Sequence, residues 1–275
     1  MLKVAVLGAS GRMGRAVLEC IAETDDLQIS GAITETSDPA IGKDVGQSIG
    51  LPTAGVPLTD DRAQGLHDAH VAIDFTLPTA TLANVRACVE NGTALVIGTT
   101  GLEEKHLNAI AEASRDIPLV YARNMSVGIN VFMNLVGRAA KTLGPDYDVE
   151  ITEAHHRNKV DAPSGTALAL GEAVAKAQNR ELDEVAIHGR HGQIGPRVPG
   201  TIGFSVIRGG NIVGDHTVLF VAPEETIEMS HHAVDRKCFA RGALKAARWV
   251  AGQAPGLYSM ADVLELNTTN DRNIA

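Results

Sequence analysis

The densest group of reactive side chains lies at residues 153–159, Glu-Ala-His-His-Arg-Asn-Lys. His155, His156, Arg157 and Lys159 can all carry positive charge, in a chain whose net charge is −9. A cationic group within an acidic protein indicates a pocket for a substrate that carries carboxylates. His155 and Lys159 could each supply a proton, because histidine titrates near neutral pH and a lysine among cations has a lowered pKa. The alternative for any one of them is a solvated surface charge.

A helix start is expected directly after this cluster, where residues 160–166 read Val-Asp-Ala-Pro-Ser-Gly-Thr. Ser164 is of the residue type that caps a helix N-terminus. Gly165 and Thr166 would then present backbone N–H groups and a hydroxyl to an anion. The pattern places an anion site beside the cationic cluster.

A metal site is the other chemistry that so many histidines suggest. Besides the adjacent pair, the candidates are His188, His191, His216, His231 and His232. None has the His-x-x-x-His helical spacing with a neighbouring glutamate, and no cysteine joins them. We therefore expect no metal. His231 and His232 lie on an expected strand, so a structural role is the alternative to a functional one for this pair.

A second motif, near the N-terminus, is typical of dinucleotide binding. Gly8, Gly11 and Gly14 follow a short apolar run and open a helical pattern, which allows a tight turn and close approach of a pyrophosphate. Glu35 lies past the next expected strand, where an acidic residue binds the adenosine ribose. The alternative is a plain tight turn with a solvated glutamate. The residue after Glu35 is Thr36 and not an arginine, so Arg12 is the one side chain expected to bind a 2′-phosphate. The sequence therefore favours NADH weakly over NADPH.

Two further segments follow expected parallel strands, where open α/β sheets bind ligands. Gly98, Thr99 and Thr100 are small and leave space for a nicotinamide ring. Residues 122–125, Ala-Arg-Asn-Met, take the equivalent place after the next strand. For both segments an ordinary loop is the alternative.

The elements that must position these groups change character along the chain. Expected strands at 3–7, 27–33, 71–75, 94–97 and 119–122 alternate with expected helices at 13–21, 78–90 and 103–114, with a long loop at 36–60. This alternation predicts right-handed βαβ units and a parallel sheet. After about residue 126 come a helix at 131–143, a strand at 149–154, a helix after Ser164 and strands at 201–207, 212–221 and 226–233. These predict an α+β part with a mixed or antiparallel sheet, in which 209–211 looks like a hairpin connection. A last helix is expected at 236–251.

Composition excludes several classes of function. Aromatic residues are 3% of the chain, and the charge is acidic, so base stacking and general binding of nucleic acid are disfavoured. Cys20, Cys88 and Cys238 are too far apart for a zinc ribbon or a disulfide framework. No apolar run approaches the ~20 residues of a membrane span, and the start is too short for a signal-peptide core. The expected location is the cytoplasm.

Taken together, these segments resemble the 4-hydroxy-tetrahydrodipicolinate reductase (dihydrodipicolinate reductase) family over essentially the full length. Residues 153–166 carry the most specific part of the resemblance. The supporting matches are residues 4–14, 73–76, 96–101, 124–128, 197–203 and 214–217.

The resemblance implies a Rossmann-like, parallel-sheet cofactor domain at 1–126, completed by 236–275. An inserted α+β mixed-sheet domain at 127–235 would bind substrate and build a homotetramer. The implied reaction is hydride transfer from NAD(P)H to a cyclic imine with two carboxylates, giving tetrahydrodipicolinate in diaminopimelate and lysine biosynthesis. A proton source must neutralise the charge that the hydride brings, and closure over both ligands would exclude water.

The resemblance also implies roles for individual residues. His155 is the proton donor and acceptor, Lys159 a proton donor, and His156, Gly165 and Thr166 bind substrate carboxylate. The implied cofactor contacts are Gly8, Ala9, Ser10, Gly11, Arg12, Met13, Glu35, Thr36, Gly98, Thr99, Thr100, Ala122, Arg123, Asn124 and Met125. The chain departs from some members at Thr36, where they carry an arginine, and at Arg123 and Met125.

Two rival functions remain at this point. Another Rossmann reductase or epimerase would act on a different substrate and show no dependence on a dicarboxylate heterocycle. A redox sensor without enzymatic activity would bind NAD(P)H without turnover, and would keep its function when His155 or Lys159 is replaced.

Overall fold

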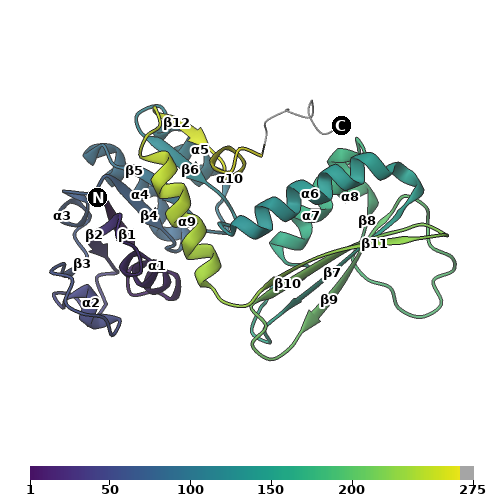
Figure 1. Ribbon diagram of the computed structural model, residues 1–275, viewed down its shortest axis with the longest axis horizontal. Coiled ribbons are helices and arrows are strands. Elements are labelled where there is room, and N and C mark those ends of the chain that lie inside the picture. Colours follow the sequence, from purple (N-terminus) through teal and green to yellow (C-terminus); the bar gives the residue numbers. More distant parts are fainter. Residues whose placement is uncertain (267–275) are drawn as a thin grey trace. The chain divides into compact units, whose positions relative to one another are not determined.

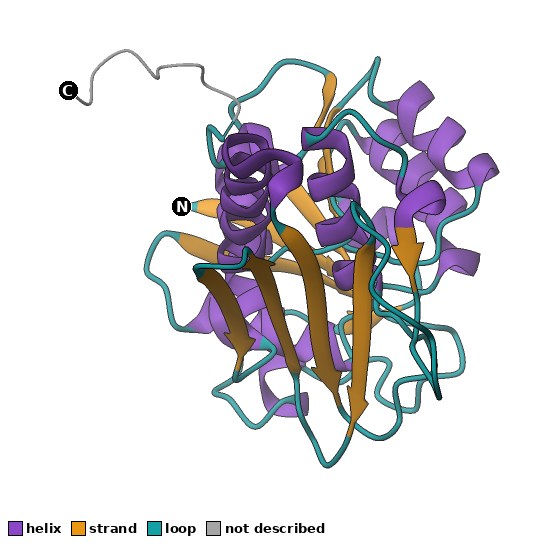
Figure 2. Cartoon of the chain, turned by 90° about the vertical axis from the view of Figure 1, so that its right-hand side faces the viewer, coloured by secondary structure: helices purple, strands orange, loops and turns teal. Residues whose placement is uncertain are grey.

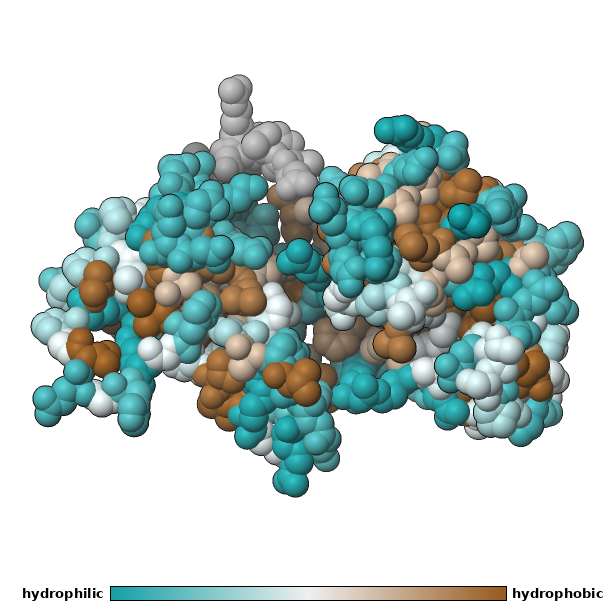
Figure 3. Space-filling view, turned by 180° about the vertical axis from the view of Figure 1, so that it is seen from behind, coloured by the Kyte–Doolittle hydropathy of each residue, from teal (hydrophilic) through white to brown (hydrophobic). Residues whose placement is uncertain are grey.

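The computed structural model describes residues 1–266 and divides the chain into two compact units. Unit 1 comprises Met1–Val127 and the described chain from Arg236, and unit 2 comprises Gly128–Asp235. Residues 267–275, which the predicted first domain includes, lie outside the described residues. No helix in the described part of the chain is long and apolar enough to cross a membrane. On the face drawn in Figure 3, hydrophilic side chains dominate, with small hydrophobic patches between them.

Unit 1 is built on a seven-stranded sheet of order β12-β6-β5-β4-β1-β2-β3, and every pairing in it is parallel. Its strands are β1 (Leu2–Leu7), β2 (Leu27–Ile33), β3 (Leu58–Thr59), β4 (Val71–Asp74), β5 (Ala94–Ile97), β6 (Pro118–Tyr121) and β12 (Gly256–Tyr258). The predicted parallel α/β sheet is confirmed. The strand order reverses between β1 and β4, which is the switch point where such sheets bind ligands.

Helices cover both faces of this sheet (Figure 1). They are α1 (Arg12–Ala22), α2 (Val45–Ser48), α3 (Arg62–Leu66), α4 (Pro78–Asn91), α5 (Glu104–Ala113), α9 (Lys237–Val250) and α10 (Met260–Val263). α1 and α9 pack into one hydrophobic cluster with the sheet, and α4 and α5 into another. The central strands β4 and β5 are buried throughout, which is why they appear as continuous apolar runs in the sequence.

Three details of unit 1 differ from the sequence prediction. The expected loop at 36–60 contains α2 and the two-residue strand β3. The short helix α3, which follows that loop, was not indicated by the sequence. β12 and α10, which the sequence did not indicate, follow α9, and β12 extends the sheet beside β6. All of these elements are too short to give a period in the sequence.

Unit 2 has a five-stranded mixed sheet of order β11-β10-β7-β9-β8 (Figure 2). The strands are β7 (Asp148–His155), β8 (Ala186–Ile187), β9 (Ile202–Arg208), β10 (Gly214–Val221) and β11 (Thr226–Ala233). The helices are α6 (Val127–Leu143), α7 (Gly165–Ala177) and α8 (Leu182–Val185), with a 3₁₀ turn at Gly144–Asp146. α6 and α7 pack on one face, where Val149 and Ile151 of β7 and Val218 and Phe220 of β10 join the core.

The predicted hairpin at 209–211 is wrong. β9 and β10 do not pair with each other, because β7 lies between them, parallel to β9 and antiparallel to β10. Gly209 and Gly210 instead bond to β7 and the residues after it: Gly209 donates to the His155 carbonyl, and the Gly210 carbonyl accepts from Arg157. The connection therefore passes the end of β7, next to its histidines.

Candidate active site

The glycine turn between β1 and α1 depends on glycine at two positions for different reasons. Gly8 has a φ of +78°, a conformation that side chains rarely adopt. A Cβ on Gly14 would lie 2.1 Å from the Gly8 carbonyl oxygen, so the helix could not approach the strand so closely with any other residue. The turn thus brings the first turn of α1 against the end of β1.

This turn leaves the N-terminus of α1 open to a ligand. α1 begins after Gly11, no described side chain caps it, and its first turn holds no acidic residue. A cavity of about 460 Å³ lies beside it. Open N–H groups at a helix N-terminus, next to a glycine turn, fit the pyrophosphate of a dinucleotide.

Most of the predicted residues of the turn line this cavity, together with the end of β2. The lining includes Gly8, Ser10, Gly11, Arg12, Met13, Thr34, Glu35, Arg62, Thr76, Leu77 and Asn84. Ala9 is buried behind the turn, where its N–H donates to the Ile33 carbonyl. Thr36 is exposed and is not among the lining residues.

A second carboxylate, which the sequence analysis missed, lies next to Glu35. Asp38 accepts a hydrogen bond from Thr34 Oγ1 at 2.7 Å, and Thr34 Oγ1 lies 2.6 Å from Ser10 Oγ in the glycine turn. Hydrogen bonds from Ser10, Thr34 and the Ala40 N–H hold the pKa of Asp38 below its ordinary value. Asp38 is therefore an anion tied to the turn. Its position three residues after Glu35 was the available signal.

The other two predicted cofactor segments line a second cavity of about 360 Å³. Its walls are Met13, Phe75, Thr76, Leu77, Gly98, Thr99, Thr100, Arg123, Asn124, Met125 and Phe239. Ala122 lies just before this lining and is half-buried. The two cavities share Met13, Phe75, Thr76 and Leu77, so the predicted cofactor residues of unit 1 border two adjoining spaces.

A buried carboxylate at the end of β4 fixes the wall between these cavities. Asp74 is fully buried and accepts hydrogen bonds from the Thr76 N–H at 2.7 Å, Thr76 Oγ1 at 2.6 Å and Asn84 Nδ2 at 2.9 Å. Thr99 Oγ1 lies 3.4 Å from the same oxygen that accepts from Thr76. Asp74 thereby links the end of β4, which borders the switch point, to the segment after β5. An aspartate closing a buried strand was the sequence signal for it.

In unit 2, His155 is the last residue of β7 and is buried against other polar groups. Its Nδ1 lies 2.6 Å from Oε2 of Glu153. Its ring packs edge-on against the ring of His216, with the two ring centroids 5.2 Å apart. Burial lowers the pKa of His155 below its ordinary value, Glu153 opposes that change, and Lys159 and Arg208 add to it. The lowered pKa favours the neutral imidazole, which can accept a proton.

Lys159 follows in the turn after β7. Its Nζ lies 2.8 Å from Oδ1 of Asp161, and its N–H donates to the His156 carbonyl at 3.1 Å. Lys159 was expected among cations, and in the structure it also has the Asp161 carboxylate as its partner. His156 itself is half-buried, next along the chain from His155. The structure thus brings His155, His156 and Lys159 into one turn.

The predicted helix start after this turn is confirmed. Ser164 caps α7, and its Oγ accepts from the Ala167 N–H at 3.1 Å. Gly165 and Thr166 form the first turn of this 13-residue helix. Gly165 is exposed, and despite burial a hydrogen bond from its N–H helps Lys159 to hold the pKa of Asp161 below its ordinary value, so this helix start already faces one carboxylate.

The remaining histidines do not gather into a metal-binding group. Within residues 1–266 there is no cluster of three or more His, Cys, Asp or Glu side chains that could hold an ion. His216 is only 5% exposed, and its Nε2 lies 3.2 Å from Ser164 Oγ. Burial lowers the pKa of His216 to about 3. His216 is therefore neutral and belongs to the surroundings of His155.

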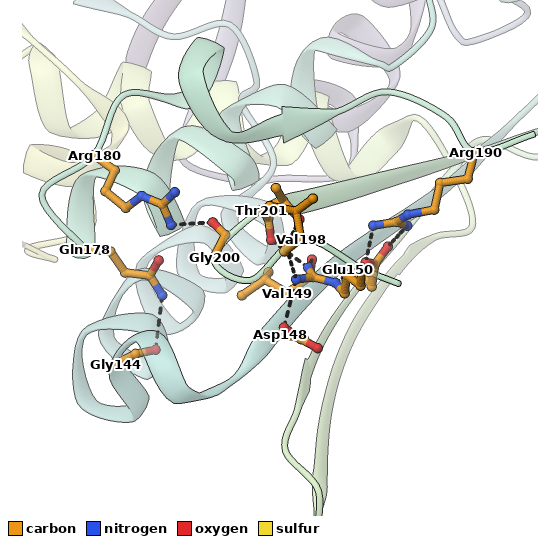
Figure 4. Close-up of polar contacts among 11 residues, drawn as sticks. Gly144, Asp148, Val149, Glu150, Gln178, Arg180, Arg190, Val198, Gly200 and Thr201 are labelled. Atoms are coloured by element: carbon orange, nitrogen blue, oxygen red, sulfur yellow. Dashed lines mark hydrogen bonds and ion pairs between the residues drawn. The ribbon is translucent and has the colours of Figure 1, made fainter. Parts of the chain in front are cut away.

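The segment from His188 to Thr201 is held to the outer face of β7 by arginines (Figure 4). Arg190 binds Glu150 through two nitrogens, each at 2.8 Å. Arg197 donates to Asp148 Oδ1 at 2.7 Å and to the Thr201 carbonyl at 2.6 Å. Arg180 donates to the Gly200 carbonyl. These contacts give the long segment a defined path.

Comparison with known proteins covers both units. The family model described as "Dihydrodipicolinate reductase, N-terminus" matches residues 2–125, and that described as "Dihydrodipicolinate reductase, C-terminus" matches residues 128–264. The chain is 50% identical over 266 residues to the 4-hydroxy-tetrahydrodipicolinate reductase of Hahella chejuensis, covering 97% of this chain and 100% of that protein. It is 51% identical to the protein of the same name from Nitrosospira multiformis, covering 96% and 98%.

Solved structures agree in fold. A dipicolinate-bound dihydrodipicolinate reductase from Paenisporosarcina sp. TG-14 is similar with a TM-score of 0.76 and 21% identity, over 95% of this chain and 98% of that chain. An amine dehydrogenase from Mycobacterium smegmatis is similar with a TM-score of 0.62 and 14% identity, over 94% and 95%. With the family models matching both units and relatives half identical throughout, the chain belongs to the dihydrodipicolinate reductase family of oxidoreductases.

Proposed function

We propose that this chain reduces 4-hydroxy-tetrahydrodipicolinate, via dihydrodipicolinate, to tetrahydrodipicolinate in diaminopimelate and lysine biosynthesis. The observation that carries the proposal is the turn after β7, in which His155 and Lys159 lie close in the chain to the N-terminus of α7. This turn combines proton donors with an anion site, as reduction of a dicarboxylate imine requires. The identity of about 50% with relatives of that name supports the same substrate.

In this proposal unit 1 holds the nicotinamide cofactor. The glycine turn and the N-terminus of α1 bind its pyrophosphate, Glu35 binds the adenosine ribose, and Gly98–Thr100 with 122–125 hold the nicotinamide end. When bound, the cofactor supplies the hydride that reduces the substrate. Asp74 supports this role by fixing Thr76 and Thr99 in the walls of the adjoining cavities.

Unit 2 binds the substrate and supplies the proton. His156, Gly165 and Thr166 bind a carboxylate, with the positive end of the α7 dipole behind them. A hydride added to the conjugated carbon–nitrogen system leaves negative charge on the substrate, which a proton must neutralise. Lys159 Nζ and His155 Nε2 are the two proton-carrying atoms proposed for that step.

The assay that tests the proposal follows oxidation of NAD(P)H with substrate formed in situ from pyruvate and aspartate semialdehyde. We expect absorbance of the reduced cofactor to fall only when both precursors are present. Cofactor binding without oxidation would favour the redox sensor, and oxidation with an unrelated imine but not this one would favour another Rossmann reductase.

We propose that NADH is used at least comparably to NADPH. Glu35 and Asp38 place two carboxylates near the glycine turn, and their charge opposes a 2′-phosphate. We expect Thr36→Arg to raise kcat/KM for NADPH about 10-fold, the worth of one charge-assisted hydrogen bond. Steady-state kinetics with both cofactors measures this. Gln28→Arg adds the same charge near the start of β2 and serves as control. A wild-type kcat/KM strongly favouring NADPH contradicts the preference.

We also propose a homotetramer built through the outer face of the unit 2 sheet. Ile207 of β9 on this face is 51% exposed, and Thr217 of β10 and Ser230 of β11 pair their hydroxyls on the same face at 2.9 Å. Burying such an apolar side chain favours association. We expect Ile207→Glu to dissociate the assembly, as measured by sedimentation velocity, while Leu77→Glu, an equally drastic change in unit 1, leaves it intact. A wild-type monomer refutes this part of the proposal.

Cytoplasmic residence completes the proposal. Cys20, Cys88 and Cys238 form no disulfide among the described residues, as is usual where the redox environment is reducing. Two of them are buried, and burial raises the pKa of Cys88 above its ordinary value. Such thiols act as small core residues and need no oxidising compartment.

A further inference from the structure

Glu153 is a buried carboxylate whose two oxygens are both fully engaged. The residue is 1% exposed on β7. Its Oε1 accepts from the Ser164 N–H at 2.9 Å and from Arg208 Nη2 at 2.7 Å. Its Oε2 accepts from Arg208 Nη1 at 2.7 Å and lies 2.6 Å from His155 Nδ1. The bidentate guanidinium and the backbone amide fix the carboxylate in position and orientation.

The carboxylate decides which nitrogen of His155 carries the proton in the neutral ring. Burial by itself would raise the pKa of Glu153, but Arg208, His155 and the Ser164 N–H outweigh burial and hold the pKa below its ordinary value. An ionised carboxylate can only accept, so His155 Nδ1 must donate to it. The neutral imidazole is therefore the Nδ1–H tautomer, and Nε2 is the atom that gains or loses a proton.

His155 Nε2 lies next to a glycine of the neighbouring strand β10. A Cβ on Gly214, the first residue of β10, would lie 3.0 Å from His155 Nε2 and 3.4 Å from Cδ2. Any larger residue would press on the working end of the ring. Glycine here avoids that crowding, at the side of the ring away from Glu153.

Every element packed around His155 contributes a charged or titratable group. Glu153 is on its own strand, Arg208 on β9 and His216 on β10, and Lys159 and Asp161 are on the turn to α7. His216 is neutral, because burial lowers its pKa to about 3, and the charge of His231 on β11 lowers the same pKa further. Lys159 and Arg208 lower the pKa of His155, so Glu153 is the group that opposes them.

We propose that Glu153 is a positioning residue for catalysis: it fixes His155 as the Nδ1–H tautomer and aims Nε2 at the reacting group, while Arg208 and Ser164 hold Glu153. This inference rests on the proposed function for its kinetic readout and on the geometry alone for its spectroscopic one. Arg208 was not among the residues that the sequence indicated, because it comes from a strand 55 positions away.

The test compares wild type with Glu153→Gln by ¹⁵N NMR of the histidine rings and by the pH profile of kcat/KM. An amide cannot accept on both sides. With its oxygen turned to Ser164 and Arg208, its NH₂ faces His155 Nδ1 and favours the Nε2–H tautomer. Loss of the negative charge also lowers the pKa of His155. Activity that needs protonated His155 falls as pH rises through that pKa, so the falling limb moves to lower pH, and we expect kcat to drop about 100-fold.

Glu150→Gln is the matched control, because Glu150 is also bound by arginines on β7 but points to the opposite face. It should leave the tautomer and the pH limb unchanged. Glu153→Asp keeps the charge and should restore the wild-type limb and part of kcat. Equal effects of Glu153→Gln and Glu150→Gln on stability, with an unmoved limb, would show a merely structural role and overturn the proposal.

Wild-type NMR decides the matter even if Glu153→Gln does not fold. An Nε2–H tautomer of His155 in the wild-type protein overturns the proposal, and an Nδ1–H tautomer supports it. If the tautomer and its change on mutation are as expected but the wild type does not oxidise NAD(P)H with the proposed substrate, the positioning role stands and the proposed function fails.

Discussion

Lys159→Ala and His155→Ala each lower kcat by about 10²- to 10⁴-fold, the usual contribution of a positioned acid or base. The physical reason is that each replacement removes an atom that can deliver the proton, while the cofactor groove belongs to unit 1 and keeps all its lining residues. Steady-state kinetics gives kcat, and titration of cofactor fluorescence gives the Kd for NADH, which should stay within about 2-fold of wild type.

Lys141→Ala is the control for this pair, because Lys141 is an exposed lysine near the end of α6. It should leave kcat unchanged. Asp161→Asn separates charge from position: it removes the carboxylate 2.8 Å from Lys159 Nζ but leaves the lysine in place. Unchanged turnover in both Lys159→Ala and His155→Ala contradicts the assignment of the reaction to this turn.

Gly14→Ala weakens cofactor binding and destabilises unit 1. The added Cβ would lie 2.1 Å from the Gly8 carbonyl oxygen and 2.8 Å from Ala9 Cα, both backbone atoms of the turn itself. The helix must move away from the strand, at a cost of about 3 kcal/mol in the free energy of unfolding. Displaced N–H groups lose part of their contact with the pyrophosphate, so the Kd for NADH rises by about 10-fold or more.

Thermal unfolding and the same fluorescence titration measure these two effects. Gly252→Ala is the control, since the nearest atom to a Cβ there is the Trp249 carbonyl oxygen at 3.9 Å, an ordinary van der Waals contact. It should change neither quantity. Wild-type affinity in a folded Gly14→Ala protein means that the turn does not hold the dinucleotide.

Residues that repeat with a regular period made the fold of unit 1 predictable. The apolar run of β1, the helix after Gly11 and the proline that opens α4 all act locally, and the structure places these elements within a residue or two of their predicted bounds. Parallel order then follows from alternation of strands and helices. β12 could not be found this way, because three residues beside β6 leave no periodic signal.

Strand pairing in unit 2 could not be predicted, because it depends on contacts between distant residues. The glycines after β9 have the composition of a hairpin turn, yet β9 pairs with β7, whose His155 lies opposite Arg208. The same limit applies to the site. One contiguous segment indicated His155, Lys159, Gly165 and Thr166 as candidates, whereas Arg208, His216 and Gly214 join it only through the order of the strands.

The route of the chain through unit 1 sets an order for its synthesis. α9 fits against the rest of the unit so closely that a Cβ on Gly242 would lie 1.7 Å from the Met125 carbonyl oxygen. This helix leaves the ribosome after all of unit 2, whose residues are contiguous in the chain. Unit 2 can therefore complete its core first, while the part of the unit 1 sheet that α9 covers, on the same face as α1, is still exposed. During translation that face is a natural target for chaperones.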